Sequence, residues 1–230
     1  MKIHGFQKIT MLDFPGRIAA TVFTAGCNMR CPFCHNARLV THIESEDQMS
    51  EEEILSYLEK RKGMLEGVCI TGGEPLMQSD IAEFISKIKA LGLLVKLDTN
   101  GCFPEKLKQL VNDRLVDYVA MDIKNAPSLY GKTVGIDGFS LDSVEESKNF
   151  LIGSGIDYEF RTTVVAELHN KESMLELAKW ISGAKNYYLQ SFTDSGDLIG
   201  EGFSSPSREF MRETQSLVAP FVEKVELRGM

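Results

Sequence analysis

Strand-like and helix-like patterns alternate along the 230-residue chain, and this alternation constrains the fold more than any other feature. Short runs rich in β-branched and aromatic residues each precede a longer stretch with apolar residues at helical spacing. We predict strands at residues 17–24, 67–71, 93–98, 117–124, 157–165, 186–192 and 222–227, and helices at 50–61, 79–91, 104–112, 141–154, 171–182 and from about 205. Strand–helix units in this order predict a parallel sheet with helices outside it.

The length of the chain suits six such units better than eight, because a complete (β/α)8 barrel takes about 250 residues. The sequence therefore predicts an α/β fold: a partial (β/α)6 TIM-type barrel with an open parallel sheet and outer helices. We expect one domain over residues 1–230, with a core at about 17–192 and a C-terminal helix and strand at about 205–228.

Composition narrows the class of protein further. Apolar residues make up 43% and charged residues 25% of the chain, which is ordinary for a soluble globular protein. A net charge of −8 argues against general binding to nucleic acid or to acidic membranes. The N-terminus lacks the apolar core of a signal peptide, and no apolar run approaches the roughly 18 residues of a membrane span. We expect a cytoplasmic protein.

Three of the five cysteines, Cys27, Cys31 and Cys34, lie within eight residues directly after the first predicted strand. A cubane iron–sulfur cluster normally takes four thiolates, so three would leave one iron open to a ligand that is not protein. An open coordination position is typical of catalytic metal sites. Zinc, with His35 as a further ligand, and a redox role remain alternatives, because zinc and thioredoxin-like sites also use paired cysteines.

Polar motifs follow the later strands, where ligands bind in parallel α/β folds. Gly72 and Gly73 permit close approach of the backbone to a ligand, and Glu74 offers a carboxylate to an ammonium group. A polar turn, Asp-Thr-Asn-Gly, occupies residues 98–101, and Cys102 follows it.

The fourth and later strands add further candidates. Asp122 and Lys124 share one face of their strand, and Lys124 is a natural partner for a carboxylate. Arg161 and Gln190 lie on the fifth and sixth strands.

Structural readings of these residues stay open at this point. The glycine pair could form a turn before a helix, Asp122 and Lys124 could form an ordinary ion pair, Arg161 could pair with a neighbouring acid, and Gln190 could serve as a structural hydrogen bonder. We expect the side chains of four further residues to serve in packing: Cys69, Cys102, Tyr187 and Tyr188. The acidic residues 44–53 are expected to form a solvated loop and the start of a helix. No role is predicted for His4, His42 and His169.

The combination of CxxxCxxCHN at residues 27–36, GGEP at 72–75, DTNG at 98–101 and DIK at 122–124 resembles radical S-adenosylmethionine (SAM) enzymes. More narrowly, it resembles glycyl-radical-enzyme activating proteins, which include pyruvate formate-lyase activating enzyme. The stretch from Gly5 to Asn36 looks most like activating proteins of anaerobic ribonucleoside-triphosphate reductase.

This resemblance implies roles for individual residues. Cys27, Cys31 and Cys34 would ligate a [4Fe-4S] cluster whose open iron binds the amino and carboxylate groups of SAM. Gly72, Gly73 and Glu74 would hold the SAM ammonium, and Lys124 would face its carboxylate. Asp98, Thr99 and Asp122 would order the same region, and one form of this implication places a monovalent cation among them. Phe33 and the backbone at His35 and Asn36 would border the adenine. Arg161 and Gln190 match polar positions at strand ends.

The implied activity is reductive cleavage of SAM to methionine and a 5′-deoxyadenosyl radical, which abstracts hydrogen from a glycine of a partner enzyme. The resemblance implies two partners. One is a glycyl radical enzyme, for which anaerobic ribonucleotide reductase is the leading candidate, and the other is an electron donor of the flavodoxin or ferredoxin type. The alternatives are activation of another glycyl radical enzyme, a small radical SAM enzyme acting on a nucleotide or other metabolite, and a non-enzymatic cluster or zinc protein. We expect residues 125–140 and 195–205, with Tyr130 and Phe203, to face the partner.

Overall fold

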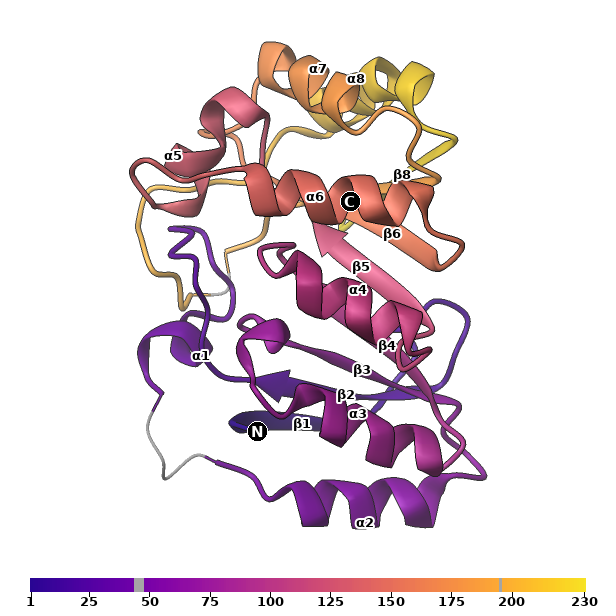
Figure 1. Ribbon diagram of the computed structural model, residues 1–230. Coiled ribbons are helices and arrows are strands. Elements are labelled where there is room, and N and C mark those ends of the chain that lie inside the picture. The colour runs from indigo at the N-terminus through magenta and orange to yellow at the C-terminus, as the bar shows by residue number, and fades with distance from the viewer. Residues whose placement is uncertain (44–47, 195) are drawn as a thin grey trace. The chain divides into compact units, whose positions relative to one another are not determined.

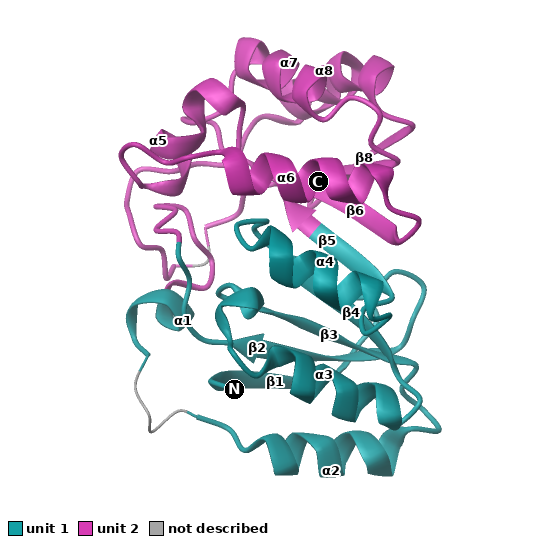
Figure 2. Ribbon diagram, viewed as in Figure 1, with its two compact units in different colours: residues 1–28, 38–120 teal, residues 29–37, 121–230 magenta. Residues whose placement is uncertain are grey.

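The computed structural model describes residues 1–43, 48–194 and 196–230. The chain forms two compact units (Figure 2): unit 1 comprises residues 1–28 and 38–120, and unit 2 comprises residues 29–37 and 121–230. In the described residues, eight strands follow one another in chain order through one sheet, and β5 (Tyr118–Asp122) has residues in both units. The expectation of a single domain stays a prediction.

Unit 1 is built on four strands that precede β5. β1 (Ile3–Thr10) is antiparallel to β2 (Ala19–Thr24), whereas β2, β3 (Gly67–Gly72) and β4 (Leu94–Thr99) are mutually parallel. Figure 1 shows helices alongside these strands. The helical segments of unit 1 are α1 (Ala37–Thr41, whose first residue belongs to unit 2), α2 (Glu51–Arg61), the 3-10 turn η2 (Pro75–Met77), α3 (Ile81–Ala90) and α4 (Pro104–Asn112).

Amphipathic helices form the core of unit 1 against the sheet. In α3, the buried residues Ile81, Phe84, Ile85 and Ile88 follow the i, i+3, i+4, i+7 spacing of one helix face. Strand residues such as Val95 and Leu97 are fully buried as well. This apolar layer fixes where β3 and β4 end, and so where their polar turns begin.

Unit 2 continues the parallel arrangement from the end of β5. β6 (Asp157–Val164) pairs with β7 (Asn186–Ser191), which pairs with β8 (Lys224–Arg228). The helical segments of unit 2 are η3 (Pro127–Leu129), α5 (Tyr130–Val134), α6 (Asp142–Gly153), α7 (Lys171–Trp180), α8 (Arg208–Val218) and η4 (Ala219–Phe221).

The prediction of an α/β fold with an open, mostly parallel sheet is confirmed. The strand β1 was not predicted, because only Ile3 and Thr10 of its residues are buried and the run therefore lacks an alternating pattern. The predicted acidic loop at residues 44–47 and Ser195 lie outside the described residues.

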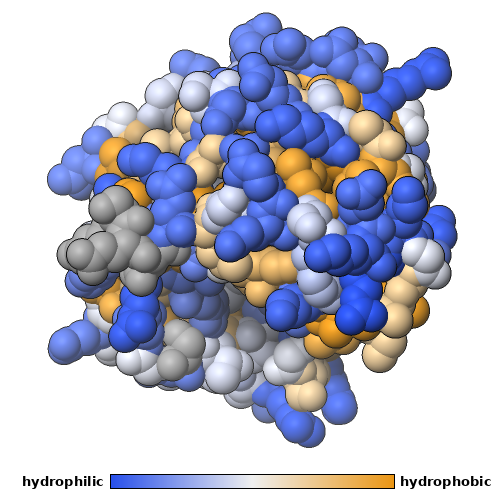
Figure 3. All heavy atoms as spheres, turned by 90° about the horizontal axis from the view of Figure 1, so that it is seen from below, coloured by the Kyte–Doolittle hydropathy of each residue, from blue (hydrophilic) through white to orange (hydrophobic). Residues whose placement is uncertain are grey.

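The surface mixes polar and apolar side chains. The face in Figure 3 is largely hydrophilic, with smaller hydrophobic areas among the charged residues. This is the ordinary surface of a folded domain, where polar groups cannot cover everything. Among the described residues, no helix combines the length and the apolar character needed to cross a bilayer.

A buried ion pair links the outer strands of unit 2. Glu159 on β6 is 1% exposed, and its two carboxylate oxygens accept hydrogen bonds of 2.9 and 3.0 Å from Arg228 on β8. The guanidinium of Arg228 also lies 3.4 Å from the ring centroid of Tyr188 on the intervening strand β7. This ion pair forms while β6, β7 and β8 stay in register.

Replacing Arg228 with Met should leave this carboxylate buried without its cation. We expect the free energy of unfolding, measured by urea titration, to fall by about 3 kcal/mol. The matched control is Arg17→Met, which breaks the exposed pair with Glu66 and should change the value by less than about 0.5 kcal/mol. Equal effects of the two substitutions would show that Glu159 does not depend on this pair.

Candidate active site

In unit 1, the glycine pair that follows β3 is joined through its backbone to the start of the cysteine loop. The Gly73 N–H donates to the Thr24 carbonyl at 2.8 Å, and the Glu74 N–H donates to the Gly26 carbonyl at 2.8 Å. A Cβ on Gly73 would lie 2.0 Å from the Gly26 oxygen. Gly72 has φ +117°, and a Cβ there would lie 2.3 Å from the Thr24 oxygen. Only glycine permits this approach, so the pair sets the path of the chain into Cys27.

The carboxylate of Glu74 joins the ends of β3 and β4. It is completely buried and accepts hydrogen bonds from the Leu76 N–H at 3.0 Å, the Thr99 hydroxyl at 2.8 Å and the Asn100 N–H at 2.6 Å. A buried carboxylate needs such donors, and in return it fixes the turn after β4. The role of Glu74 in holding the SAM ammonium stays a prediction.

Asn100 extends this network to the first cysteine. Its side-chain amide donates to the Asn28 side-chain oxygen at 2.8 Å and lies 3.9 Å from the Sγ of Cys27. Hydrogen bonds to sulfur tune the potential of a metal–thiolate centre, so Asn100 is positioned to influence Cys27. Asn100 belongs to the DTNG motif but has no role predicted from sequence, and its place directly after β4 is the signal that the sequence offers.

In unit 2, the second and third cysteines share a tight turn. The Cys34 N–H donates to the Cys31 carbonyl at 3.0 Å; Cys31 is buried and Cys34 is half-buried. Two segments of the same unit hold this turn. The carbonyl of Val134, at the end of α5, accepts from the Arg30 N–H at 3.0 Å, and the Gly200 N–H donates to the Pro32 carbonyl at 2.7 Å. The loops expected to face a partner therefore also support the cysteines.

Phe33 lies in an aromatic group within unit 2. It is buried, with ring centroids 6.5 Å from Phe192 and 6.4 Å from Phe203. The exposed His35 ring lies 5.3 Å from Phe192, and the half-buried Asn36 directly precedes α1. These contacts fix the Phe33 ring, and its contact with adenine stays a prediction.

Asp122 at the end of β5 is held by two cations. Its Oδ2 accepts from the Lys124 Nζ at 2.9 Å, and its Oδ1 accepts from the Arg161 Nε at 2.9 Å. Burial acts to raise the pKa of Asp122, but the charges of Arg161 and Lys124 outweigh it and lower this pKa to about 2. Both structural alternatives are present in this arrangement, the ion pair of Asp122 with Lys124 and the pairing of Arg161 with an acid. The contacts of these residues with SAM stay a prediction.

Lys124 stays charged in this site. Burial acts to lower its pKa, but the negative charges of Asp122 and Cys31 outweigh burial and raise the pKa of Lys124 above its ordinary value. Its backbone is fixed as well, because its carbonyl is 3.0 Å from the Nε2 of the buried His169. Sequence analysis gave His169 no role, and the structure shows it as a buried link between the ends of β5 and β6.

The expectation that Tyr130 faces a partner is wrong. Its side chain is completely buried, stacked on Phe139 at 5.5 Å between ring centroids and edge-on to Trp180 at 5.9 Å. Its hydroxyl accepts from the Lys124 N–H at 3.3 Å. Tyr130 therefore supports the end of β5 from within unit 2.

Gln190 is half-buried on β7, opposite Thr163 of β6 and Arg228 of β8 in the strand register. Its contact with SAM stays a prediction. Cys69 is completely buried, as expected of a packing residue, and Tyr187 is completely buried too.

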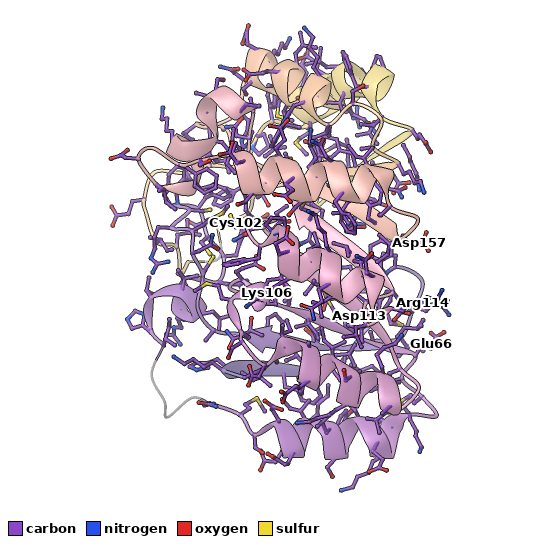
Figure 4. The ribbon with its side chains drawn as sticks, in the orientation of Figure 1. Glu66, Cys102, Lys106, Asp113, Arg114 and Asp157 are labelled. Carbon is purple, nitrogen blue, oxygen red and sulfur yellow. The ribbon has the colours of Figure 1, made fainter. Side chains whose placement is uncertain are left out.

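Different residues lie at the two ends of the strands of unit 1. Figure 4 shows Cys102 and Lys106 at the end where β3 and β4 finish, and Glu66, Asp113 and Arg114 at the opposite end. Lys106 donates to the carbonyls of Leu76 and Gln78 at 2.8 and 3.2 Å, which adds a further link to the segment after Glu74. The polar network with Cys27 thus lies at the carboxyl ends of the strands, where parallel folds bind ligands.

None of the three motif cysteines forms a disulfide, and cysteine thiolate is the ligand type that holds an iron–sulfur cluster. Cys27 belongs to unit 1, and Cys31 and Cys34 belong to unit 2. Among the described residues, no group of three His, Cys, Asp or Glu was found that could hold a metal ion. The ligand role of the three cysteines therefore stays a prediction from their spacing, and their residue type fits it.

Comparison with protein families identifies the chain. Residues 21–181 match the model of the Radical SAM superfamily, which is more than half of the chain. The chain belongs to the radical SAM superfamily. The prediction of a radical SAM enzyme is confirmed, and with it the use of a [4Fe-4S] cluster and SAM, the cofactors of this family.

Relatives of this radical SAM protein include activating enzymes. A protein of Methanocaldococcus jannaschii, provisionally named as a glycyl-radical enzyme activating enzyme, is 30% identical over 98% of this chain and 95% of its own length. Pyruvate formate-lyase-activating enzyme of Listeria monocytogenes is 37% identical over 54% of this chain and 53% of its own length. The resemblance to activating proteins stated from the motifs is confirmed.

A solved structure supports the fold. The crystal structure of Streptococcus suis SuiB bound to S-adenosylmethionine matches with a TM-score of 0.69 and 14% identity, covering 88% of this chain and 48% of SuiB. The prediction of a partial TIM-type barrel is confirmed as a fold assignment.

The close approach of the glycine pair predicts a strong effect of Gly73→Ala. Its methyl group would overlap the Gly26 carbonyl, so the start of the cysteine loop must shift. We expect the free energy of unfolding to fall by about 2 kcal/mol, and the iron bound after anaerobic reconstitution to decrease. Gly153→Ala is the control, because nothing lies within 4 Å of its added Cβ. Full iron loading of Gly73→Ala would contradict the proposed coupling.

The low pKa of Asp122 predicts a pH dependence of stability. Because its pKa in the folded state, about 2, lies below the unfolded value of about 3.9, the contribution of Asp122 is complete above about pH 5 and is lost as pH falls toward 2. Asp122→Asn should remove about 2 kcal/mol at neutral pH and flatten the fall in stability below pH 5. Urea unfolding across pH measures both, with Asp113→Asn, at an exposed position, as the control. An unchanged pH profile would contradict this prediction.

Proposed function

We propose that this radical SAM protein is an activase that installs a glycyl radical, with anaerobic ribonucleoside-triphosphate reductase as its partner. The support is its alignment over nearly its full length with a relative named as a glycyl-radical enzyme activating enzyme. The choice of reductase is supported by the sequence from Gly5 to Asn36, which resembles activating proteins of that reductase.

Cys27, Cys31 and Cys34 would hold the cluster, which would supply the electron for reductive cleavage of SAM to methionine and a 5′-deoxyadenosyl radical. The proposed outcome is removal of one hydrogen atom from the Cα of a partner glycine, with 5′-deoxyadenosine and a glycyl radical as products. The electron comes from an external donor of the flavodoxin or ferredoxin type. The protein acts in the cytoplasm.

The residues of this chain bind SAM and orient it. In unit 1, Gly72, Gly73 and Glu74 hold the SAM ammonium, with Thr99 and Asp98 ordering the adjoining turn. The network of Glu74, Asn100 and Cys27 supports this assignment, because it links the proposed ammonium site to a proposed cluster ligand.

In unit 2, Lys124 faces the SAM carboxylate while Asp122 and Arg161 fix its position. Its raised pKa supports this role, since a charged ammonium is needed to bind a carboxylate. Phe33, with the backbone at His35 and Asn36, borders the adenine, and Gln190 contributes at the end of β7.

The loops at residues 125–140 and 196–205 provide the partner surface of the enzyme. Phe203 is the aromatic candidate in this surface, because it is half-buried against Phe33. Val134 and Gly200 hold the cysteine turn, so a partner that contacts these loops would act close to the cluster ligands.

The decisive test combines reconstituted, reduced protein with SAM and anaerobic ribonucleotide reductase. We expect a glycyl radical doublet in electron paramagnetic resonance and one 5′-deoxyadenosine for each radical formed. Cys31→Ala should give neither product, and a reductase with its radical glycine replaced by alanine should give no doublet.

A parallel reaction with pyruvate formate-lyase separates the partners. A doublet with pyruvate formate-lyase alone would overturn the choice of reductase and retain the activase function. Cleavage of SAM with no doublet from either partner, together with an altered small molecule, would overturn the activase function in favour of a metabolite-directed enzyme.

A further inference from the structure

A lysine is buried in the sheet of unit 1. Lys96 lies in the middle of β4, and its side chain is only 2% exposed. Lysine is almost never buried to this extent unless it is paired, because removing an ammonium from water is costly. The sequence carries the signal, a single charged residue within the run Leu-Leu-Val-Lys-Leu at residues 93–97, but sequence analysis did not single it out.

The ammonium of Lys96 is paired with Asp98. Both residues lie on the same face of β4, and the Lys96 Nζ forms a direct hydrogen-bonded ion pair with the Asp98 Oδ1. Cys69, opposite Lys96 in the register of β3 and β4, adds its Sγ at 3.8 Å from the same Nζ and 3.7 Å from the same carboxylate oxygen. The Asp98 side chain is 13% exposed, so its negative charge is largely removed from water.

Asp98 lies next to residues of the proposed SAM site, so its pair with Lys96 concerns that site as well as the packing of β4. Asp98 directly precedes Thr99 and Asn100, whose donors hold the Glu74 carboxylate. The resemblance to activating proteins implies a monovalent cation in the region that Asp98, Thr99 and Asp122 order. A largely buried carboxylate is costly without a positive charge beside it, and Lys96 supplies that charge from within the same strand.

We propose that the ammonium of Lys96 takes the place of a monovalent metal cation beside Asp98, so that SAM binding by this enzyme does not depend on sodium or potassium. A second cation next to Asp98 would be repelled by the ammonium across a poorly solvated site. Lys96 is thus a positioning residue: it keeps the Asp98 carboxylate in place and neutralised. This inference rests on the proposed function, because it concerns SAM binding at the same site.

The test compares SAM affinity and thermal unfolding of the cluster-loaded protein in sodium, potassium and N-methylglucamine chlorides at equal ionic strength. N-methylglucamine is too large to replace a bound metal cation. Wild-type protein should give the same SAM affinity and melting temperature in all three salts.

Lys96→Met removes the charge while keeping a long apolar side chain. We expect this variant to bind SAM about tenfold more weakly in N-methylglucamine, and to regain affinity and melting temperature in sodium or potassium. Lys96→Arg should remain independent of the salt, because it keeps the positive charge. The control is Lys87→Met, an exposed position on α3 that should behave as wild type.

Two results would overturn the proposal. One is a wild-type protein whose SAM affinity rises in sodium or potassium, which shows that a metal cation binds despite Lys96; this measurement needs no variant. The other is a Lys96→Met protein that is weakened equally in all three salts, which indicates packing alone. No glycyl radical partner takes part in these measurements, so failure of the proposed activase function leaves them interpretable.

Discussion

The buried carboxylate of Glu74 is the interaction on which the active-site half of unit 1 depends. It gathers donors from the turn after β3 and from the end of β4, and its own backbone N–H is bonded to Gly26 at the start of the cysteine loop. A carboxylate that is completely buried is tolerated only with such donors, so the three strand ends are mutually dependent. This network therefore holds the backbone that leads into Cys27.

In unit 2, a carboxylate at the end of β5 is likewise held by several donors. Asp122 is flanked by Lys124 and Arg161, which leaves an excess of positive charge where the proposed function requires a partner for the SAM carboxylate. The backbone around this charge cluster is fixed by buried groups, His169 from the segment after β6 and Tyr130 from α5. Aromatic packing and hydrogen bonding thus hold the cations that are proposed to bind the cofactor.

The sequence predicted the repeated strands and helices because each carries a local apolar pattern that survives in the fold. It also predicted which strand ends bear the functional motifs, since those residues are adjacent in the chain to the strands that position them. It failed for Tyr130, because an aromatic residue in a glycine- and serine-rich loop looked exposed, while Phe139 and Trp180 cover it in the structure. The link from Asn100 to Cys27 was equally hidden, since it joins residues of different strand ends.

Lys96 shows why such residues matter for the chemistry as well as for the fold. Each of the two aspartates at the strand ends has a cation supplied by its own unit, Lys96 for Asp98 and Lys124 with Arg161 for Asp122. A charge that is neutralised by a side chain is neutralised whenever the protein is folded, whereas a bound metal cation depends on its concentration. Within each unit, the positive charge beside the aspartate is therefore expected to be the same whichever monovalent salt is present.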